Sequence, residues 1–219
     1  MHPIRETARY TATQCKKIND SCYVYHFPKN IAGVTELNVK GKKGTILRLK
    51  HGELLDKNGK VNMANIDYHY RPTDDSDPFQ TDIVILSGKE DSFMPKFNYK
   101  GFQFVEISSS APIELSGENL IAVEMHSDVP ATGYWSSSSD LLNKIWEATN
   151  SSYLANLFGY PTDCPQREKN GWTGDAHITI ETGLYNFDGI SVYEKWMNDF
   201  CDEQKDNGVL PCICLLYTS

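Results

Sequence analysis

Short runs in which apolar and polar residues alternate dominate the chain from about Thr11 to Val129. Such alternation is typical of a strand with one buried face. Turn residues at Pro28, Lys40-Gly41 and Asn58-Gly59 separate several of the runs. Because almost no segment of helical period lies between them, the pattern favours an antiparallel β-sandwich. The predicted strands are Tyr23–Phe27, Thr35–Val39, Thr45–Leu49, Thr81–Leu86, Phe102–Ile107 and Leu120–Met125.

Apolar residues take up helical spacing after Gly133. The serine run 136–139 and Asp140 offer N-cap oxygens to a first helix, which Pro161 ends. Thr173-Gly174-Asp175 can cap a second helix that runs through Leu184. A third helix places four apolar side chains at i, i+3, i+4 and i+7, and we expect all of them to be buried on one face: Tyr193, Trp196, Met197 and Phe200. So few helices cannot close a core by themselves, which predicts an incomplete second domain.

Composition narrows the function classes. The 219 residues carry a net charge of −8 and are 40% hydrophobic. Basic residues are thinly spread, which argues against a nucleic-acid partner. No apolar run approaches the roughly 20 residues of a membrane-spanning helix. Aromatic residues make up 11% of the chain and, as stacking surfaces, suit neutral polar ligands such as sugars.

The six cysteines are too sparse for a disulfide framework and lack zinc-ligand spacing, so we expect free thiols, no metal and no cofactor. The first residues lack the apolar stretch of a signal peptide. Either the protein is cytoplasmic or its true N-terminus is missing. A homo-oligomer stays open as an assembly state.

One loop concentrates polar chemistry between the first two predicted helices. It holds three carboxylates (Asp163, Glu168 and Asp175), Arg167 and Trp172. Glycoside hydrolysis requires a carboxylic acid that protonates the leaving oxygen and a second carboxylate that activates water or attacks the sugar. A solvated charged turn is the competing interpretation of the residues alone.

The run Pro161-Thr162-Asp163-Cys164-Pro165-Gln166-Arg167-Glu168, followed by Gly171-Trp172-Thr173-Gly174-Asp175-Ala176, resembles the signature of bacterial α-L-rhamnosidases of glycoside hydrolase family 78. Flanking segments such as Asn30-Ile31-Ala32-Gly33 and His51-Gly52-Glu53-Leu54-Leu55 agree with it, so the resemblance covers about residues 20–213. It implies β-sandwich domains before an (α/α)6 barrel of the six-hairpin glycosidase type, and an inverting mechanism.

The resemblance also implies residue roles. Glu168 is the general acid, Asp163 and Arg167 contact the rhamnose hydroxyls, Trp172 packs against the sugar, and Asp175 is a further polar contact. Many family members have one more residue between the arginine and the glycine. Counting back from Trp172 places the acid on Glu168 in either version.

Three other residues attract attention as chemistry. His51 and Glu53 can form an acid/base pair, but the resemblance puts them in a scaffold domain, and we expect a structural role. His177 stands where family members commonly have glutamine, and we expect a helix-surface histidine.

The resemblance predicts this division of the chain: residues 1–20 as the end of a preceding domain or a linker, 21–133 as the concanavalin-like β-sandwich, and 134–213 as the N-terminal part of the barrel. Residues 214–219 match one reading frame of a transposase-adapter sequence, and we interpret them as an artefact. The family's general base lies further along than this chain extends.

The leading hypothesis is therefore a fragment of an inverting α-L-rhamnosidase that acts on a rhamnose-containing carbohydrate and is inactive in isolation. One alternative is a non-catalytic carbohydrate-binding β-sandwich protein. Another is a related six-hairpin glycosidase of different sugar specificity.

Overall fold

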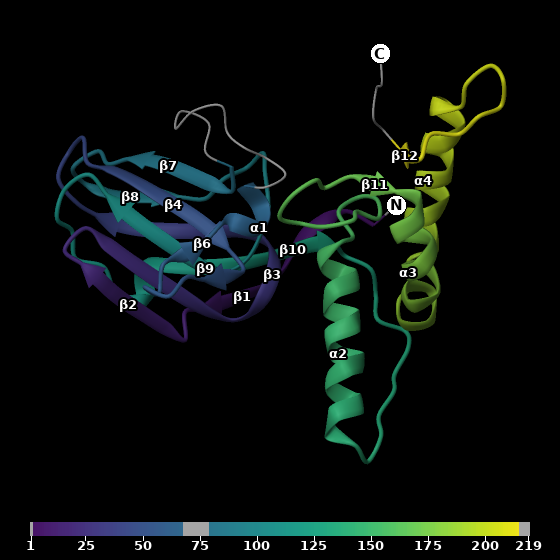
Figure 1. Cartoon of the computed structure of the whole chain (residues 1–219), viewed down its shortest axis with the longest axis horizontal. Helices are drawn as coiled ribbons and strands as arrows, with labels where there is room; N and C mark the ends of the chain where they lie inside the picture. Colours follow the sequence, from purple (N-terminus) through teal and green to yellow (C-terminus); the bar gives the residue numbers. More distant parts are fainter. Residues whose placement is uncertain (1, 68–78, 215–219) are drawn as a thin grey trace. The chain divides into compact units, whose positions relative to one another are not determined.

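The computed structural model describes residues 2–67 and 79–214 and divides into two compact units. The first is Glu6–Glu124 and is built from strands. The second takes up the chain from Met125, together with its first residues, and is built mainly from helices. Figure 1 shows strands in the first unit and long helices in the second.

The β unit is one curled sheet of eight strands in the order β1-β10-β3-β9-β4-β7, with β2 and β8 also paired to β3. All the registered pairs are antiparallel, as the alternating pattern predicts. The strands are β1 (Ile4–Thr11), β2 (Gln14–Asn19), β3 (Cys22–Lys40), β4 (Ile46–Gly52), β7 (Thr81–Ile85), β8 (Glu90–Phe93), β9 (Lys100–Ser109) and β10 (Leu120–Ser127).

The long strand β3 pairs with different neighbours along its length. Its first part pairs with β2 and β9, and its last part pairs with β10 and β8. The register against β9 shifts between His26 and Ile31, where Pro28 has no N–H to donate to the ladder. The predicted strand end at Pro28 is therefore an irregularity inside a single strand.

A single apolar cluster fills the sandwich. Its largest fully buried members come from three different strands, β3, β4 and β9, and full burial of one such side chain contributes about 1.5–3 kcal/mol. They include Tyr23, Tyr25, Phe27, Leu37, Leu47, Leu49, Phe102 and Ile107. The predicted strands Thr35–Val39 and Thr45–Leu49 thus turn alternate residues inward.

Residues 1–20, set apart from the sandwich in the sequence analysis, contribute β1 and β2 to its sheet. Lys16 pairs with Val24, and Lys17 with Tyr23. Their alternation is hard to recognise in the sequence, because most side chains of β1 and β2 are exposed.

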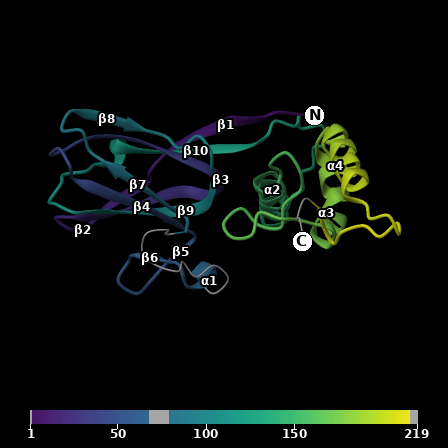
Figure 2. The ribbon, with the colours of Figure 1, turned by 90° about the horizontal axis from the view of Figure 1, so that it is seen from above.

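Smaller elements flank the sheet of the sandwich. Strands β5 (Leu54–Leu55) and β6 (Val61–Asn62) form a hairpin. Gly59 takes a positive φ of 76° in its turn, a conformation that glycine adopts without a steric penalty. The short helix α1 (Ala64–Asp67) follows, and a single 3-10 turn, η1, spans Gly117–Asn119. Figure 2 shows β5, β6 and α1 below the sheet.

The second unit contains α2 (Asp140–Ala155), α3 (Thr173–Asn186) and α4 (Ile190–Glu203), as the spacing predicts. The short strands β11 (Gly171–Trp172) and β12 (Ile213–Cys214) pair with each other. On α4, Tyr193, Trp196 and Phe200 are buried, whereas Met197 is 48% exposed. The buried stripe of α4 therefore lacks one of the four residues predicted for it, Met197.

The start of α2 is stabilised by hydrogen bonds between Ser137 and Asn143, and not by the predicted serine cap. Ser139 occupies the N-cap position, but its side chain makes no capping hydrogen bond. Instead, the Ser137 N–H donates to Asn143 Oδ1 (2.8 Å), and Asn143 Nδ2 donates to the Ser137 carbonyl (3.0 Å).

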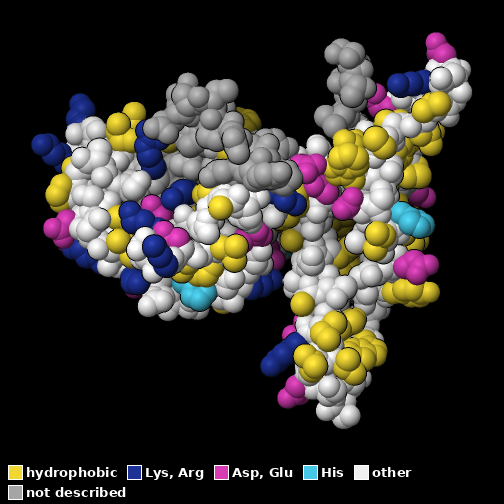
Figure 3. Space-filling view, viewed as in Figure 1, with side chains coloured by type: hydrophobic (Ala, Val, Ile, Leu, Met, Phe, Trp, Pro, Cys, Tyr) yellow, Lys and Arg dark blue, Asp and Glu magenta, His cyan; other side chains and the backbone are white. Residues whose placement is uncertain are grey.

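Several apolar side chains of the helical unit are exposed. Figure 3 shows hydrophobic side chains gathered over the lower end of α2. The most exposed are Tyr134, Leu141, Ile145, Ile178, Tyr185 and Ile190. Within the described residues, no helix is both long enough and apolar enough to span a membrane.

Candidate active site

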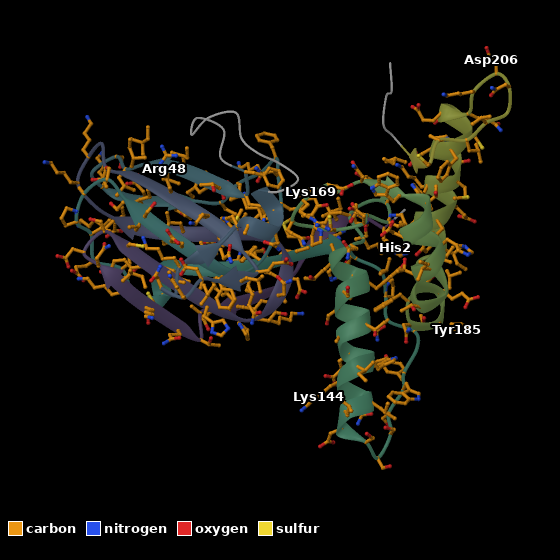
Figure 4. All side chains as sticks on the ribbon, in the orientation of Figure 1. His2, Arg48, Lys144, Lys169, Tyr185 and Asp206 are labelled. Atoms are coloured by element: carbon orange, nitrogen blue, oxygen red, sulfur yellow. The ribbon has the colours of Figure 1, made fainter. Side chains whose placement is uncertain are left out.

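The polar loop predicted from the sequence connects α2 to α3. A bridge between Leu157 and Pro161 opens it, and β11 closes it. The Tyr160 hydroxyl donates to the Lys169 carbonyl (3.0 Å). Lys169 has a positive φ of 57°, which is costly for a residue with a side chain. Figure 4 places Lys169 in the loop above α2.

Asp163 closes the loop through both its backbone and its side chain. Its N–H donates to the Asn170 carbonyl (3.0 Å), and its Oδ1 accepts the Asn170 N–H (2.9 Å). Its Oδ2 accepts the thiol of the next residue, Cys164 (2.9 Å). Both carboxylate oxygens of Asp163 are therefore bound inside the loop.

Cys164 lies at the centre of these contacts and is 7% exposed. Its sulfur also accepts the backbone N–H of Glu168 (3.4 Å). Burial, followed by the hydrogen bond to Asp163, raises the pKa of the Cys164 thiol. The residue is consequently a protonated thiol at neutral pH, a poor nucleophile.

Arg167 supplies the positive charge of the loop. Hydrogen bonding with the Cys164 sulfur is the main cause that raises the pKa of its guanidinium, and Glu168 and Asp163 add to it. The Nε of Arg167 is buried and has no hydrogen-bond partner in the described part of the chain. An unpaired buried donor costs about 1–3 kcal/mol.

Glu168 and Trp172 contact each other directly. The indole Nε1 of Trp172 donates to Oε2 of Glu168 (2.9 Å). Trp172 lies in β11, where it pairs with Ile213 of β12. A short strand therefore positions the indole that holds this carboxyl group.

A groove of about 580 Å³ lies between α2 and α3. Its walls come from both helices, and its acidic residues are Asp163 and Asp175; Glu168 is absent from the described residues that line it. Asp175 is exposed in the first turn of α3, where a negative charge is favourable. The other lining residues are Ile145, Ala148, Thr149, Ser152, Tyr153, Asn156, Pro161, Thr162, Ile178, Thr179 and Thr182.

The predicted residues thus form two sets. Contacts through Cys164 connect Asp163, Arg167 and Glu168, and Trp172 joins them through Glu168. Asp175 forms the second set: it lines the same groove as Asp163, and this is what relates it to the other predicted residues. Among the residues described, no cluster of three or more His, Cys, Asp or Glu side chains is arranged to hold a metal ion.

The two histidines considered in the sequence have different environments. His51 is fully buried in the sandwich, and its Nδ1 donates to the Gln80 carbonyl (3.1 Å), so its Nε2 accepts the Thr35 hydroxyl (3.0 Å). Burial and the charge of Lys100 lower the pKa of His51 to about 3. His177 is exposed on α3, where it was expected.

Glu53 is part of the scaffold contacts as well. Its Oε1 accepts Nδ2 of Asn30 (2.7 Å). This hydrogen bond connects two of the segments on which the resemblance rests. His51 and Glu53 therefore have separate structural contacts, which are those of a scaffold and not of an acid/base pair.

Three residues that brace the loop were missed by the sequence reasoning: Tyr160, Cys164 and Asn170. The signal for Cys164 was a cysteine in a loop of charged residues, since cysteine is usually buried. Nothing local marks Asn170, because its role depends on the loop closing back on Asp163.

Two family models match the chain. Residues 16–126 match the bacterial alpha-L-rhamnosidase concanavalin-like domain, and residues 130–214 match the bacterial alpha-L-rhamnosidase 6 hairpin glycosidase domain. The expected fold class, a concanavalin-like β-sandwich followed by a six-hairpin glycosidase domain, is confirmed.

Solved structures and curated proteins agree with these matches. The structure of alpha-L-rhamnosidase from Dictyoglumus thermophilum is 33% identical with a TM-score of 0.90, and the match covers 100% of this chain and 24% of that one. The Streptomyces avermitilis alpha-L-rhamnosidase complexed with L-rhamnose is 27% identical with a TM-score of 0.88, over 98% and 20% of the two chains. An alpha-L-rhamnosidase of Formosa agariphila is 32% identical over 209 residues, 90% of this chain and 20% of its own length. The chain spans about a fifth of the length of these curated relatives.

Proposed function

Because this chain belongs to the bacterial α-L-rhamnosidase family, we propose that it carries the acid side of an inverting α-L-rhamnosidase. The substrate is a glycoside or polysaccharide with terminal, non-reducing α-L-rhamnose. The observation that carries the proposal is the Glu168 carboxyl group, held by Trp172 in a loop that also positions Arg167.

Glu168 acts as the general acid. The Trp172 N–H donates to Oε2, so in the protonated acid the carbonyl oxygen is Oε2 and the proton is on Oε1. Transfer of that proton to the glycosidic oxygen allows the bond between this oxygen and the anomeric carbon to break. A water molecule attacks the opposite face of the sugar and loses its proton to a base, which yields β-L-rhamnose and an alcohol.

The neighbouring residues bind the sugar. The guanidinium of Arg167, a partly exposed residue, donates to a rhamnose hydroxyl, and Asp163 accepts from another hydroxyl with its remaining lone pairs. Trp172 provides an apolar wall for the ring. Asp175 is a further polar contact from the groove between α2 and α3.

The general base lies outside this chain in our proposal, and the 219 residues alone are therefore inactive. Inverting enzymes keep their two carboxyl groups about 6.5–9.5 Å apart to admit the attacking water. Support comes from the share of the relatives' length that the chain spans, about a fifth.

We also propose that residues 134–213 are the N-terminal part of the barrel and that residues 214–219 derive from an adapter sequence. Resequencing the parent locus tests the second point, since these codons in the genome would contradict it.

The test is hydrolysis of methyl α-L-rhamnoside, whose leaving group depends on the acid, by the product of the complete gene, with NMR of the first sugar formed. We expect β-L-rhamnose as the first product. For Glu168→Gln we expect kcat to fall on the order of 10² to 10⁴-fold, the effect of removing a general acid. Glu181→Gln is the matched control, because Glu181 is exposed on α3.

Several outcomes would contradict the proposal. Full activity of Glu168→Gln would remove Glu168 from the acid role, and α-L-rhamnose as the first product would exclude inversion. Turnover of another glycoside in place of the rhamnoside would favour the alternative sugar specificity. Sugar binding by the β-sandwich, without hydrolysis and unaffected by changes at 163–175, would favour the carbohydrate-binding alternative.

A further inference from the structure

The thiol of Cys164 connects two residues that the proposed reaction uses. It donates to Oδ2 of Asp163 (2.9 Å) and accepts the backbone N–H of Glu168 (3.4 Å). The first contact orients a carboxylate, and the second sets the position of the main chain that carries the acid. Cys164 itself is absent from the described residues that line the groove between α2 and α3, whereas its partner Asp163 lines it.

We propose that Cys164 is a positioning residue: its buried sulfur fixes the placement of the Glu168 carboxyl group relative to Asp163 and Arg167. The inference rests on the proposed function of Glu168. Cys164 itself contacts neither the sugar nor the reacting atoms. It acts by bringing the two ends of the segment 163–168 together at one atom.

The properties of a thiol suit this position. Burial raises the pKa of Cys164, so the S–H proton is retained and is donated to Asp163, while the sulfur lone pairs accept from Glu168 and contact Arg167. A serine hydroxyl can make the same types of hydrogen bond, but its shorter C–O bond brings the oxygen less far toward both partners. An alanine makes neither.

Placement of the acid matters for the rate, because a displacement of about 1 Å can cost on the order of 10²-fold. The loop has other closing contacts, between Asp163 and Asn170 and between Tyr160 and Lys169. These retain its outline when the thiol is removed. The expected defect in Cys164→Ala is thus a misplaced acid in a folded protein.

The experiment compares two substrates in the product of the complete gene. A 2,4-dinitrophenyl rhamnoside has a leaving group that departs with little protonation, whereas a methyl rhamnoside depends on the acid. For Cys164→Ala we expect kcat on the methyl rhamnoside to fall on the order of 10-fold to 10²-fold, with a much smaller change on the dinitrophenyl rhamnoside. Cys164→Ser should recover part of the loss.

The control is Cys201→Ala, since Cys201 is exposed on α4, and it should leave both rates unchanged. An equal fall on both substrates in Cys164→Ala would indicate a merely structural cysteine and overturn the inference, as would unchanged rates. If Cys164→Ala does not fold, Cys164→Ser decides by the same comparison of substrates.

Failure of the proposed function gives a different result, because the unaltered protein then hydrolyses neither rhamnoside. Hydrogen exchange of the Glu168 amide in the 219-residue chain decides the inference in that case. We expect the Glu168 amide to exchange faster in Cys164→Ala than in Cys201→Ala. Equal exchange in the two variants would contradict the hydrogen bond from this amide to the Cys164 sulfur.

Discussion

The indole N–H of Trp172 donates a 2.9 Å hydrogen bond to the Glu168 carboxyl group, from a residue anchored in β11 to one in the loop. Trp172→Phe keeps an aromatic wall and removes this donor. Glu168 becomes a carboxylate as it gives up its proton, and a hydrogen bond to a charged group contributes about 1.5–3 kcal/mol. We therefore expect kcat on a methyl rhamnoside to fall on the order of 10-fold or more. Steady-state kinetics of the complete enzyme measure it.

Trp172→Leu serves as the comparison, because it removes the wall as well. We expect KM to rise in this variant and to change little in Trp172→Phe. A KM that rises equally in both variants would mean that the N–H itself binds the sugar and does not orient the acid.

Gly183 of α3 packs against the ring of Tyr153 of α2, and an added Cβ would overlap the tyrosine hydroxyl. That hydroxyl is hydrogen-bonded to the one of Tyr193 (3.0 Å), and burial raises the pKa of Tyr153. Gly183→Ala therefore forces the ring to move, and we expect a loss of about 2–4 kcal/mol in the free energy of unfolding. Chemical denaturation of the 219-residue chain, followed by helix circular dichroism, measures it.

Gly174→Ala is the matched control on the same helix, because nothing lies within 4 Å of its added Cβ. Alanine favours helix over glycine by up to about 1 kcal/mol, so this variant should be slightly more stable. Equal destabilisation by both substitutions would contradict the packing of α3 against Tyr153.

Lys169 is held in the left-handed region by the closed loop, with φ at 57°. Glycine adopts this conformation without a steric penalty, whereas an L-residue there costs roughly 1 kcal/mol. We expect Lys169→Gly to leave the unfolding free energy unchanged or to raise it by up to about 1 kcal/mol. Lys144→Gly, on the exposed face of α2 (Figure 4), should lower it by about 1 kcal/mol. Similar losses in both variants, measured by denaturation, would indicate that Lys169 is not strained.

The periodic parts of this fold could be predicted because periodicity is local. Leu47 and Leu49 alternate in β4, and Tyr193, Trp196 and Phe200 repeat along α4, so each pattern already contains the direction of burial. Met197 follows the same helical spacing, yet it is half exposed, since only the neighbouring elements determine how wide the buried stripe is.

Contacts between distant residues could not be predicted in this way. Pro28 favours a strand end by its own chemistry, but pairing on both sides continues β3 beyond it. The family signature indicated Asp163 and Glu168 as site residues. The contacts of Cys164 with both of them became apparent only once the loop had closed, because no spacing rule describes a loop that folds onto a single sulfur atom.

The buried His51 makes the β-sandwich sensitive to acid. Its pKa is lowered to about 3 in the folded chain, whereas an unfolded histidine titrates near about 6.5. The unfolded chain therefore binds one more proton between these two values. The stabilising contribution is complete above the unfolded pKa and decreases as the pH falls, by up to about 1.4 kcal/mol per pH unit.

His51→Gln isolates this contribution. We expect the variant to be less stable at pH 7, because it loses a buried ring, but its unfolding free energy should fall less steeply between about pH 6 and pH 4 than that of the unaltered chain. Carboxylates titrate in the same range and contribute equally to both proteins, so the difference between the two slopes reports His51. His177→Gln, at an exposed position on α3, should keep the original slope. Parallel pH dependences for the unaltered chain and His51→Gln would show that His51 does not stay neutral in the fold.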